Sequence, residues 1–145
     1  MYRKILLCYD GTVEGRNALK DGADVALCMQ AETHLLAILR ELHPSLVPEG
    51  VSEALFRQQE EEAMRILREG VNWLLEHGLK AQGHIAYGHP IAHIDAAARN
   101  INADLIVLGH RQRSRLARWW SDSEDATLLD RACCSILVSI APAAT

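Results

Sequence analysis

The chain has 145 residues, of which 49% are hydrophobic and 23% charged, and its formal net charge is −4. This balance is that of an ordinary globular domain and excludes a disordered, collagen-like or coiled-coil chain. The acidic charge argues against a nucleic-acid binder, which normally has a basic domain, and against docking to an anionic membrane. We therefore expect a single domain that covers residues 1–145.

The start of the chain and its cysteines indicate a cytoplasmic protein. The sequence Met1-Tyr2-Arg3-Lys4 passes directly into a short apolar run, without the apolar core and cleavage site of a signal peptide. The longest apolar stretches are far too short to span a membrane. Two cysteines are adjacent and none forms a C-x-x-C pair, so we expect neither a disulfide framework nor a metal site; they are Cys8, Cys28, Cys133 and Cys134.

Short apolar runs alternate with helical patterns along the chain. A helical stripe of apolar residues follows Thr12, and amphipathic helices are expected from Ser52 to His77, from Pro90 to Ile101, and up to about Arg131. Two segments, 40–51 and 110–125, have loop-like composition. The expected strands are residues 4–9, 34–39, 80–87, 103–108 and 136–140.

This alternation predicts an α/β fold made of strand–helix–strand units. Such units give a parallel sheet with right-handed crossovers and helices on both faces, which is a doubly wound domain with five strands. Ligands of these sheets bind outside the carboxyl ends of the strands, where the strand order reverses. If the first and fourth strands flank that point, the segments Asp10-Gly11-Thr12 and Gly109-His110-Arg111 line one crevice.

Three segments together resemble the universal stress protein family in order, spacing and character. They are residues 4–12 (KILLCYDGT), Gly88-His89-Pro90 and residues 103–109 (ADLIVLG), and the resemblance extends to the closing strand. It implies a Rossmann-like sheet with strand order 3-2-1-4-5, and a cytoplasmic homodimer. In the family the last strand often pairs with the partner's copy. Here the candidate interface residues are Ile136, Val138 and Ile140.

Members of the family that bind ATP resemble a pattern of G-x-x-G, nine residues, and G-[ST]. Small residues let backbone amides close around the phosphates, and the hydroxyl adds a further contact. Counted from Gly109, the second glycine position is Gln112 and the third is Asp122, followed by Ser123. Two of the three glycines are missing, and the chain therefore resembles the branch that lacks the full ATP-binding motif.

Four arginines directly after Gly109 leave the ligand question open. Side chains such as Arg111 and Arg113 would hold phosphates where backbone amides no longer do, or they are solvated and pair with the acidic residues downstream. Asp10 keeps the family position at the adenine end, or it caps the helix and braces the turn after the first strand. The candidate ligand-binding residues are Asp10, Gly11, Thr12, Gly88, Gly109, His110, Arg111, Arg113 and Ser123.

We expect a non-enzymatic stress-response or regulatory protein that acts as a homodimer through unidentified protein partners, with no required cofactor. The alternative is a sensor of ATP or AMP, with Mg, that uses Asp10, Gly109, Arg111 and Ser123. No catalytic residues are identified, because the chain has no G-x-S-x-G elbow, P-loop or H-E-x-x-H motif. The enzymatic expectation is at most weak ATP hydrolysis or autophosphorylation.

Overall fold

The computed structural model describes residues 1–39, 52–88, 90–111 and 127–141. Its strands are β1 (Lys4–Tyr9), β2 (Glu32–Leu39), β3 (Ala81–Tyr87), β4 (Leu105–Arg111) and β5 (Ser135–Ala141). Its helices are α1 (Val13–Met29), α2 (Ser52–Glu76), α3 (Pro90–Ile101) and α5 (Thr127–Arg131). Strands and helices alternate along the chain, as the sequence pattern predicts.

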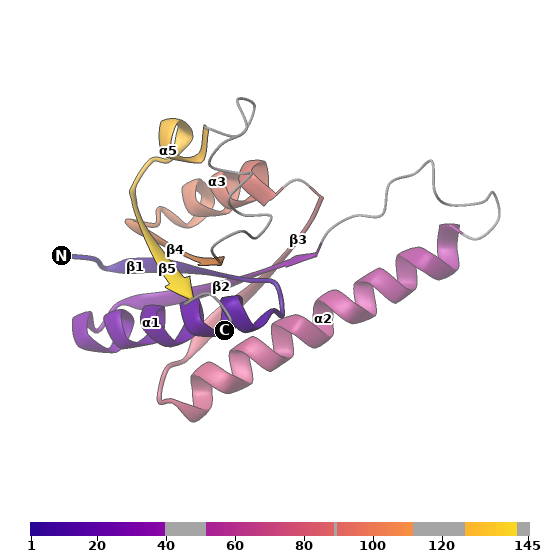
Figure 1. The fold of residues 1–145 in the computed structure, drawn as a ribbon, viewed down its shortest axis with the longest axis horizontal. Helices are drawn as coiled ribbons and strands as arrows, with labels where there is room; N and C mark the ends of the chain where they lie inside the picture. The colour runs from indigo at the N-terminus through magenta and orange to yellow at the C-terminus, as the bar shows by residue number, and fades with distance from the viewer. Residues whose placement is uncertain (40–51, 89, 112–126, 142–145) are drawn as a thin grey trace.

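The strands form one sheet in the order β3-β2-β1-β4-β5, and every neighbouring pair is parallel. This confirms the predicted fold class and the strand order that the family resemblance implies. Figure 1 shows α1 and α2 on one face of the sheet, with α3 and α5 on the other. None of the helices in the described part of the chain is both long and apolar enough to cross a membrane.

Side-chain alternation along β1 supplies a core to each face. Ile5, Leu7 and Tyr9 pack towards α1 and α2, whereas Leu6 and Cys8 pack towards α3 and the last helix. All five of these residues are less than 9% exposed, so β1 is buried on both faces. An apolar run without polar alternation is what a central parallel strand requires.

Four of the five strands have different bounds from those expected; β3 begins one residue late, and β5 is one residue longer at each end. β2 begins at Glu32, two residues early, where it pairs with Lys4 of β1. β4 begins at Leu105 and continues to Arg111, because its carboxyl end pairs with β5 as far as Ala141. The sequence places His110 and Arg111 after the strand, but their backbone belongs to it.

A carboxylate fixes the amino end of β1 beside β4. Asp104 accepts hydrogen bonds from the backbone N–H groups of Arg3, at 2.8 Å, and Lys4, at 3.0 Å. Its own N–H donates to the carbonyl oxygen of Lys4 at 2.9 Å. One side chain therefore holds together segments that are about a hundred residues apart in sequence.

We expect Asp104→Ala to lower the free energy of unfolding by about 1–3 kcal/mol, because two backbone donors lose a charged acceptor. Urea denaturation measures this difference. Asp24→Ala, which removes an exposed carboxylate from α1, is the control and should change stability by less than about 0.5 kcal/mol. Equal effects of the two substitutions would contradict the assigned role of Asp104.

Candidate functional site

The strand order reverses between β1 and β4, which lie side by side in the sheet. β2 and β3 extend from β1 in one direction, and β5 extends from β4 in the other. In a doubly wound sheet this is the position where the carboxyl ends of the strands open onto a ligand crevice. The fold therefore places the carboxyl ends of β1 and β4 side by side, and the ligand crevice between them stays a prediction.

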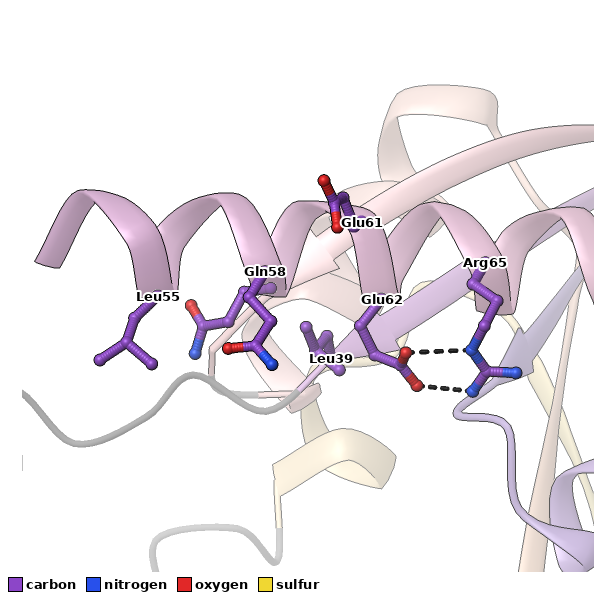
Figure 2. Close-up of a pocket in the computed structure, with 7 residues that line it drawn as sticks. Leu39, Leu55, Gln58, Glu61, Glu62 and Arg65 are labelled. Carbon is purple, nitrogen blue, oxygen red and sulfur yellow. Dashed lines mark hydrogen bonds and ion pairs between the residues drawn. The ribbon is translucent and has the colours of Figure 1, made fainter. Parts of the chain in front are cut away.

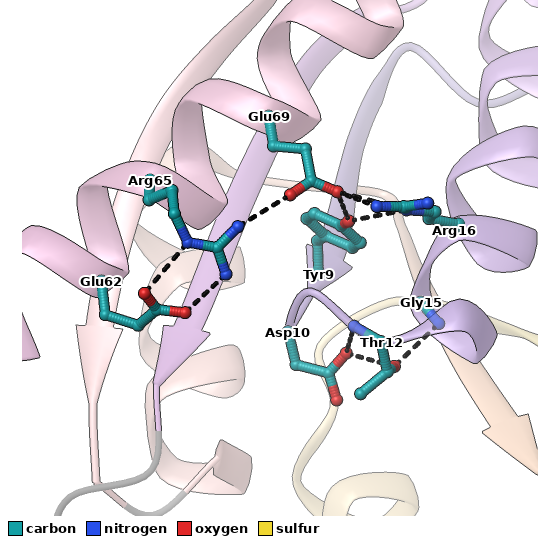
Figure 3. Close-up of polar contacts among 8 residues, drawn as sticks. All are labelled: Tyr9, Asp10, Thr12, Gly15, Arg16, Glu62, Arg65 and Glu69. Carbon is teal, nitrogen blue, oxygen red and sulfur yellow. Dashed lines mark hydrogen bonds and ion pairs between the residues drawn. The ribbon is translucent and has the colours of Figure 1, made fainter.

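The turn after β1 is closed by its own side chains. The Asp10 Oδ1 atom accepts hydrogen bonds from the Thr12 N–H at 3.0 Å and from the Thr12 hydroxyl at 2.5 Å (Figure 3). The Thr12 Oγ1 atom in turn accepts a bond from the Gly15 N–H at 3.1 Å and caps α1. Gly11, between them, has φ +83°, a conformation that favours glycine. Of the two roles considered for Asp10, the described contacts show the bracing of this turn.

Gly109 is required for close packing of α1 on β4. A Cβ atom added to Gly109 would lie 2.6 Å from the carbonyl oxygen of Glu14 and 3.2 Å from the Cβ of Ala18. The first turn of α1 therefore rests on the Gly109 backbone. This contact accounts for a glycine at position 109 whether or not a ligand binds nearby.

Of the remaining candidate ligand-binding residues, Gly88 lies away from the Asp10 turn and the side chains of the others are outside the description. Gly88 follows β3 with φ +96°, and its N–H donates to the carbonyl oxygen of Leu39 at 3.2 Å. β2 lies between β3 and β1, so Gly88 is on the far side of β2 from the Asp10 turn. The side chains of His110 and Arg111, and all of residues 112–126, lie outside the description; these include Arg113 and Ser123.

A charged network joins the end of β1 to both helices of its face. The Tyr9 hydroxyl donates to Glu69 Oε1 at 2.7 Å, and the same oxygen receives Arg16 Nη2 at 2.5 Å (Figure 3). Arg65 bonds the other Glu69 oxygen at 3.3 Å and also pairs with Glu62. The hydrogen bond from Tyr9 and the adjacent Arg16 lower the pKa of the Glu69 carboxyl. The network ties α1 and α2 to the residue that precedes Asp10.

A pocket of about 630 Å³ lies at the same end of the sheet, between the end of β2 and the first turns of α2. Figure 2 shows Leu39 of β2 facing a helix that carries Leu55, Gln58 and Glu62, with Glu62 bonded twice to Arg65. This volume falls within the range of about 300–1,000 Å³ typical of small-molecule sites. Its lining residues come from β2 and α2 alone, so the pocket is described separately from the Asp10 turn.

Sequence reasoning missed the pocket and the Tyr9 network. It interprets the charged middle of α2 as a solvated face with pairs three and four residues apart, and the bonds of Arg65 to Glu62 and Glu69 confirm that interpretation. The contacts of Glu69 with Tyr9 and Arg16 join residues 60 and 53 positions apart. Helical periodicity carries no signal for such pairs. Among the described residues, no three metal-ligating side chains gather closely enough to hold a metal ion.

Comparison with known proteins identifies the family. The model of the universal stress protein family matches residues 1–139, so the chain belongs to that family. Universal stress protein YxiE from Bacillus subtilis is 26% identical over 146 residues, covering 95% of this chain and 99% of YxiE. Universal stress protein MJ0531 from Methanocaldococcus jannaschii is 27% identical over 140 residues, and the match covers 95% of this chain and 82% of MJ0531.

Solved structures of the family share the fold. Universal stress protein UspA from Lactobacillus plantarum has a TM-score of 0.73 and 23% identity, covering 95% of this chain and 97% of its own. A family protein from Arabidopsis thaliana, solved with AMP bound, has a TM-score of 0.63 and 13% identity. The match covers 95% of this chain and 91% of the Arabidopsis chain. Two other similar structures, one of them from Archaeoglobus fulgidus, are complexes with dAMP and with cAMP.

We expect Thr12→Ala to destabilise the protein by about 1 kcal/mol, because the first turn of α1 loses its capping oxygen and Asp10 loses a donor. Thr12→Ser keeps the hydroxyl and is the matched control. Thermal unfolding of the three proteins measures the difference. A serine variant as unstable as the alanine variant would show that the methyl group, and not the cap, carries the effect.

Proposed function

We propose that this chain is a regulatory universal stress protein that works through contacts with protein partners and needs no bound ATP for its fold. It is a non-enzymatic, cytoplasmic protein in this proposal. The observation that carries the proposal is the packing of the switch-point segments. Asp10 and Thr12 bond each other, and Gly109 supports α1. Both segments thus have structural roles that do not depend on a nucleotide.

The sequence after β4 supports the same proposal. Gln112 and Asp122 occupy two of the three glycine positions of the ATP motif. A glutamine side chain keeps a phosphate from approaching the backbone there, and an aspartate carboxylate repels it electrostatically. Holding a triphosphate in this crevice would therefore require the arginines to replace several backbone contacts.

An adenine mononucleotide is the second candidate ligand, and a separate observation favours it. Three of the similar structures are complexes with AMP, dAMP and cAMP, each of which has a single phosphate. A single phosphate needs fewer backbone donors than a triphosphate, so the missing glycines matter less. In this proposal the nucleotide lies against Asp10 and Gly109, with Arg111 near its phosphate and no need for Mg.

Calorimetric titration of nucleotide-free protein with AMP and, separately, with MgATP tests both proposals. If no nucleotide is needed, neither titration gives saturable heat up to about 1 mM, which leaves less than about 4 kcal/mol of binding free energy. Saturable binding of AMP alone, at roughly micromolar Kd, would establish the mononucleotide site. The same samples assayed for phosphate release report on the proposed absence of turnover.

Variants show where any bound nucleotide lies. Asp10→Ala and Arg111→Ala should each abolish binding, whereas Asp24→Ala should leave the Kd unchanged. Thermal unfolding of each variant separates loss of binding from loss of fold. Micromolar binding of MgATP that both site variants abolish would overturn the first proposal, because the arginines would then have replaced the missing glycines.

We further propose that the partner contacts include a homodimer formed through β5. Within the described residues β5 pairs only with β4, so it is an edge strand. Unpaired edges associate readily unless they are protected. Ile136 is half-buried against the core on the α3 face, and Val138 is half-buried on the same strand. Ile140 is 62% exposed, and it is therefore the candidate that a substitution probes with least damage to the core.

We expect Ile140→Lys to raise the dimer dissociation constant at least about tenfold, because a strongly hydrated charge would enter the interface; tenfold corresponds to about 1.4 kcal/mol. Leu129→Lys is the matched control, since Leu129 of α5 is also 62% exposed. Sedimentation velocity over a concentration series measures both variants. An unchanged dimer for Ile140→Lys, or a protein that is monomeric throughout, would exclude this interface.

A further inference from the structure

A hydrogen-bonded pair of histidines, of which His34 is buried and His84 is half-buried, joins β2 to β3 on the face that α3 covers. His34 is 4% exposed although it is a polar residue in a core strand. Its neighbours on that face of the sheet include Leu6, its partner position on β1, and Leu36, two residues further along β2. His84 is half-buried on β3, whose register places it opposite Leu36. Neither histidine belongs to the candidate ligand site.

The two rings are hydrogen-bonded to each other and to a carboxylate. His34 Nδ1 lies 2.9 Å from His84 Nε2, and His34 Nε2 lies 2.8 Å from Glu32 Oε1. The ring centroids are 5.1 Å apart and the planes differ by 25°. Glu32, His34 and His84 therefore form a chain of two hydrogen bonds that starts at the exposed beginning of β2.

The three hydrogen-bonded side chains can take up only one added proton without losing a hydrogen bond. With both imidazoles neutral, His34 Nε2–H donates to Glu32, and the bare His34 Nδ1 accepts from His84 Nε2–H. One added proton goes to His84 Nδ1 and leaves both hydrogen bonds in place. A second proton must go to His34 Nδ1. Two N–H groups then face each other between two positive rings, and the side-chain hydrogen bond between His34 and His84 is lost.

The other charged groups near Glu32, His34 and His84 do not change the number of protons that the two imidazoles can accept. The hydrogen bond from His34, and then the charge of Lys4, which pairs in register with Glu32, lower the pKa of the Glu32 carboxyl. The residue of β3 opposite His34 is the uncharged Gln82. On α3, Asp95 and Arg99 bond each other, and Arg99 also reaches the carbonyl oxygen of Arg131 beside α5. His93 is the remaining titratable residue of α3.

We propose that Glu32, His34 and His84 form an acid-sensitive joint, which opens the β3 edge of the sheet when both imidazoles are protonated. Among the described strands β3 is the outermost on its side, so it separates without breaking the pairing of another described strand. Its other face seats α2, because a Cβ at Gly83 would lie 2.8 Å from Leu67 Cδ1. Opening the joint therefore loosens the seat of α2 as well. This regulation is independent of any nucleotide.

The direction of the pH effect follows from linkage. Burial, and then the adjacent His34, lower the pKa of His84 from its ordinary value. A histidine with a lower pKa in the folded chain binds its proton more tightly when the chain is unfolded. Its contribution to stability is therefore complete above about pH 6.5, the ordinary histidine value, and is lost as the pH falls below it. Acid conditions favour the open joint.

Denaturant unfolding of the whole chain between pH 7.5 and 5.5 tests the proposal. The folded-to-unfolded ratio of the wild type should fall below pH 6.5, by up to about tenfold per pH unit for each proton taken up on unfolding. His84→Gln, which keeps a hydrogen-bonding side chain that cannot become charged, should show a smaller fall. His77→Gln is the control, because His77 is an exposed histidine stacked on Trp73 beyond the end of α2. Equal pH dependence in all three proteins would overturn the proposal.

Measurements on the unaltered protein decide the question even if His84→Gln fails to fold. In an NMR titration the His84 ring should change its shifts with a midpoint below about pH 6.5. Amide hydrogen exchange, corrected for its intrinsic pH dependence, should accelerate in β3 on acidification while β1 stays protected. A His84 midpoint at or above 6.5, or corrected exchange in β3 that does not change with pH, would overturn the proposal.

Discussion

The carboxyl end of the sheet depends on how closely α1 packs against β1 and β4. At Gly22 a Cβ atom would lie 2.4 Å from Leu7 Cδ2, and at Gly109 it would lie 2.6 Å from the Glu14 carbonyl oxygen. Interiors packed at this density do not accept an added methyl group without movement. Because α1 starts directly after the Asp10–Thr12 turn, this close contact also fixes the position of the turn beside the end of β4.

Each face of the sheet carries a buried polar side chain that joins separate elements, β1 with α1 and α2 on one face and β2 with β3 on the other. On the α1 and α2 face, the Tyr9 ring is buried and its hydroxyl meets Glu69 and Arg16. On the α3 face, His34 is buried and meets His84. Buried polar groups are costly unless their hydrogen bonds are made, so these contacts restrict how the joined helices and strands fit together. The first contact adjoins the candidate ligand site, and the second lies on the β3 edge.

The family and the site chemistry give different kinds of information. Family membership rests on a match over residues 1–139 and fixes the fold and the switch point. What binds there is decided by individual residues, since one fold hosts many functions. In this chain the glycines that would hold a triphosphate are replaced at Gln112 and Asp122, while Asp10 and Gly109 are retained with roles in packing. A regulatory protein that does not need ATP is consistent with both observations.

The sequence by itself determined the order and type of the elements, because apolar periodicity directly reflects which side of a strand or helix is buried. It also determined the position of the Asp10–Thr12 turn and, through the family resemblance, the strand order. Only the tertiary structure decided that β4 extends through Arg111, that His34 faces His84, and that Glu69 reaches Tyr9. The residues that pair in these three features are 30, 50 and 60 positions apart in the chain, respectively. Patterns within one helix or strand do not predict such pairs, because each pair forms only when the helices and strands pack together.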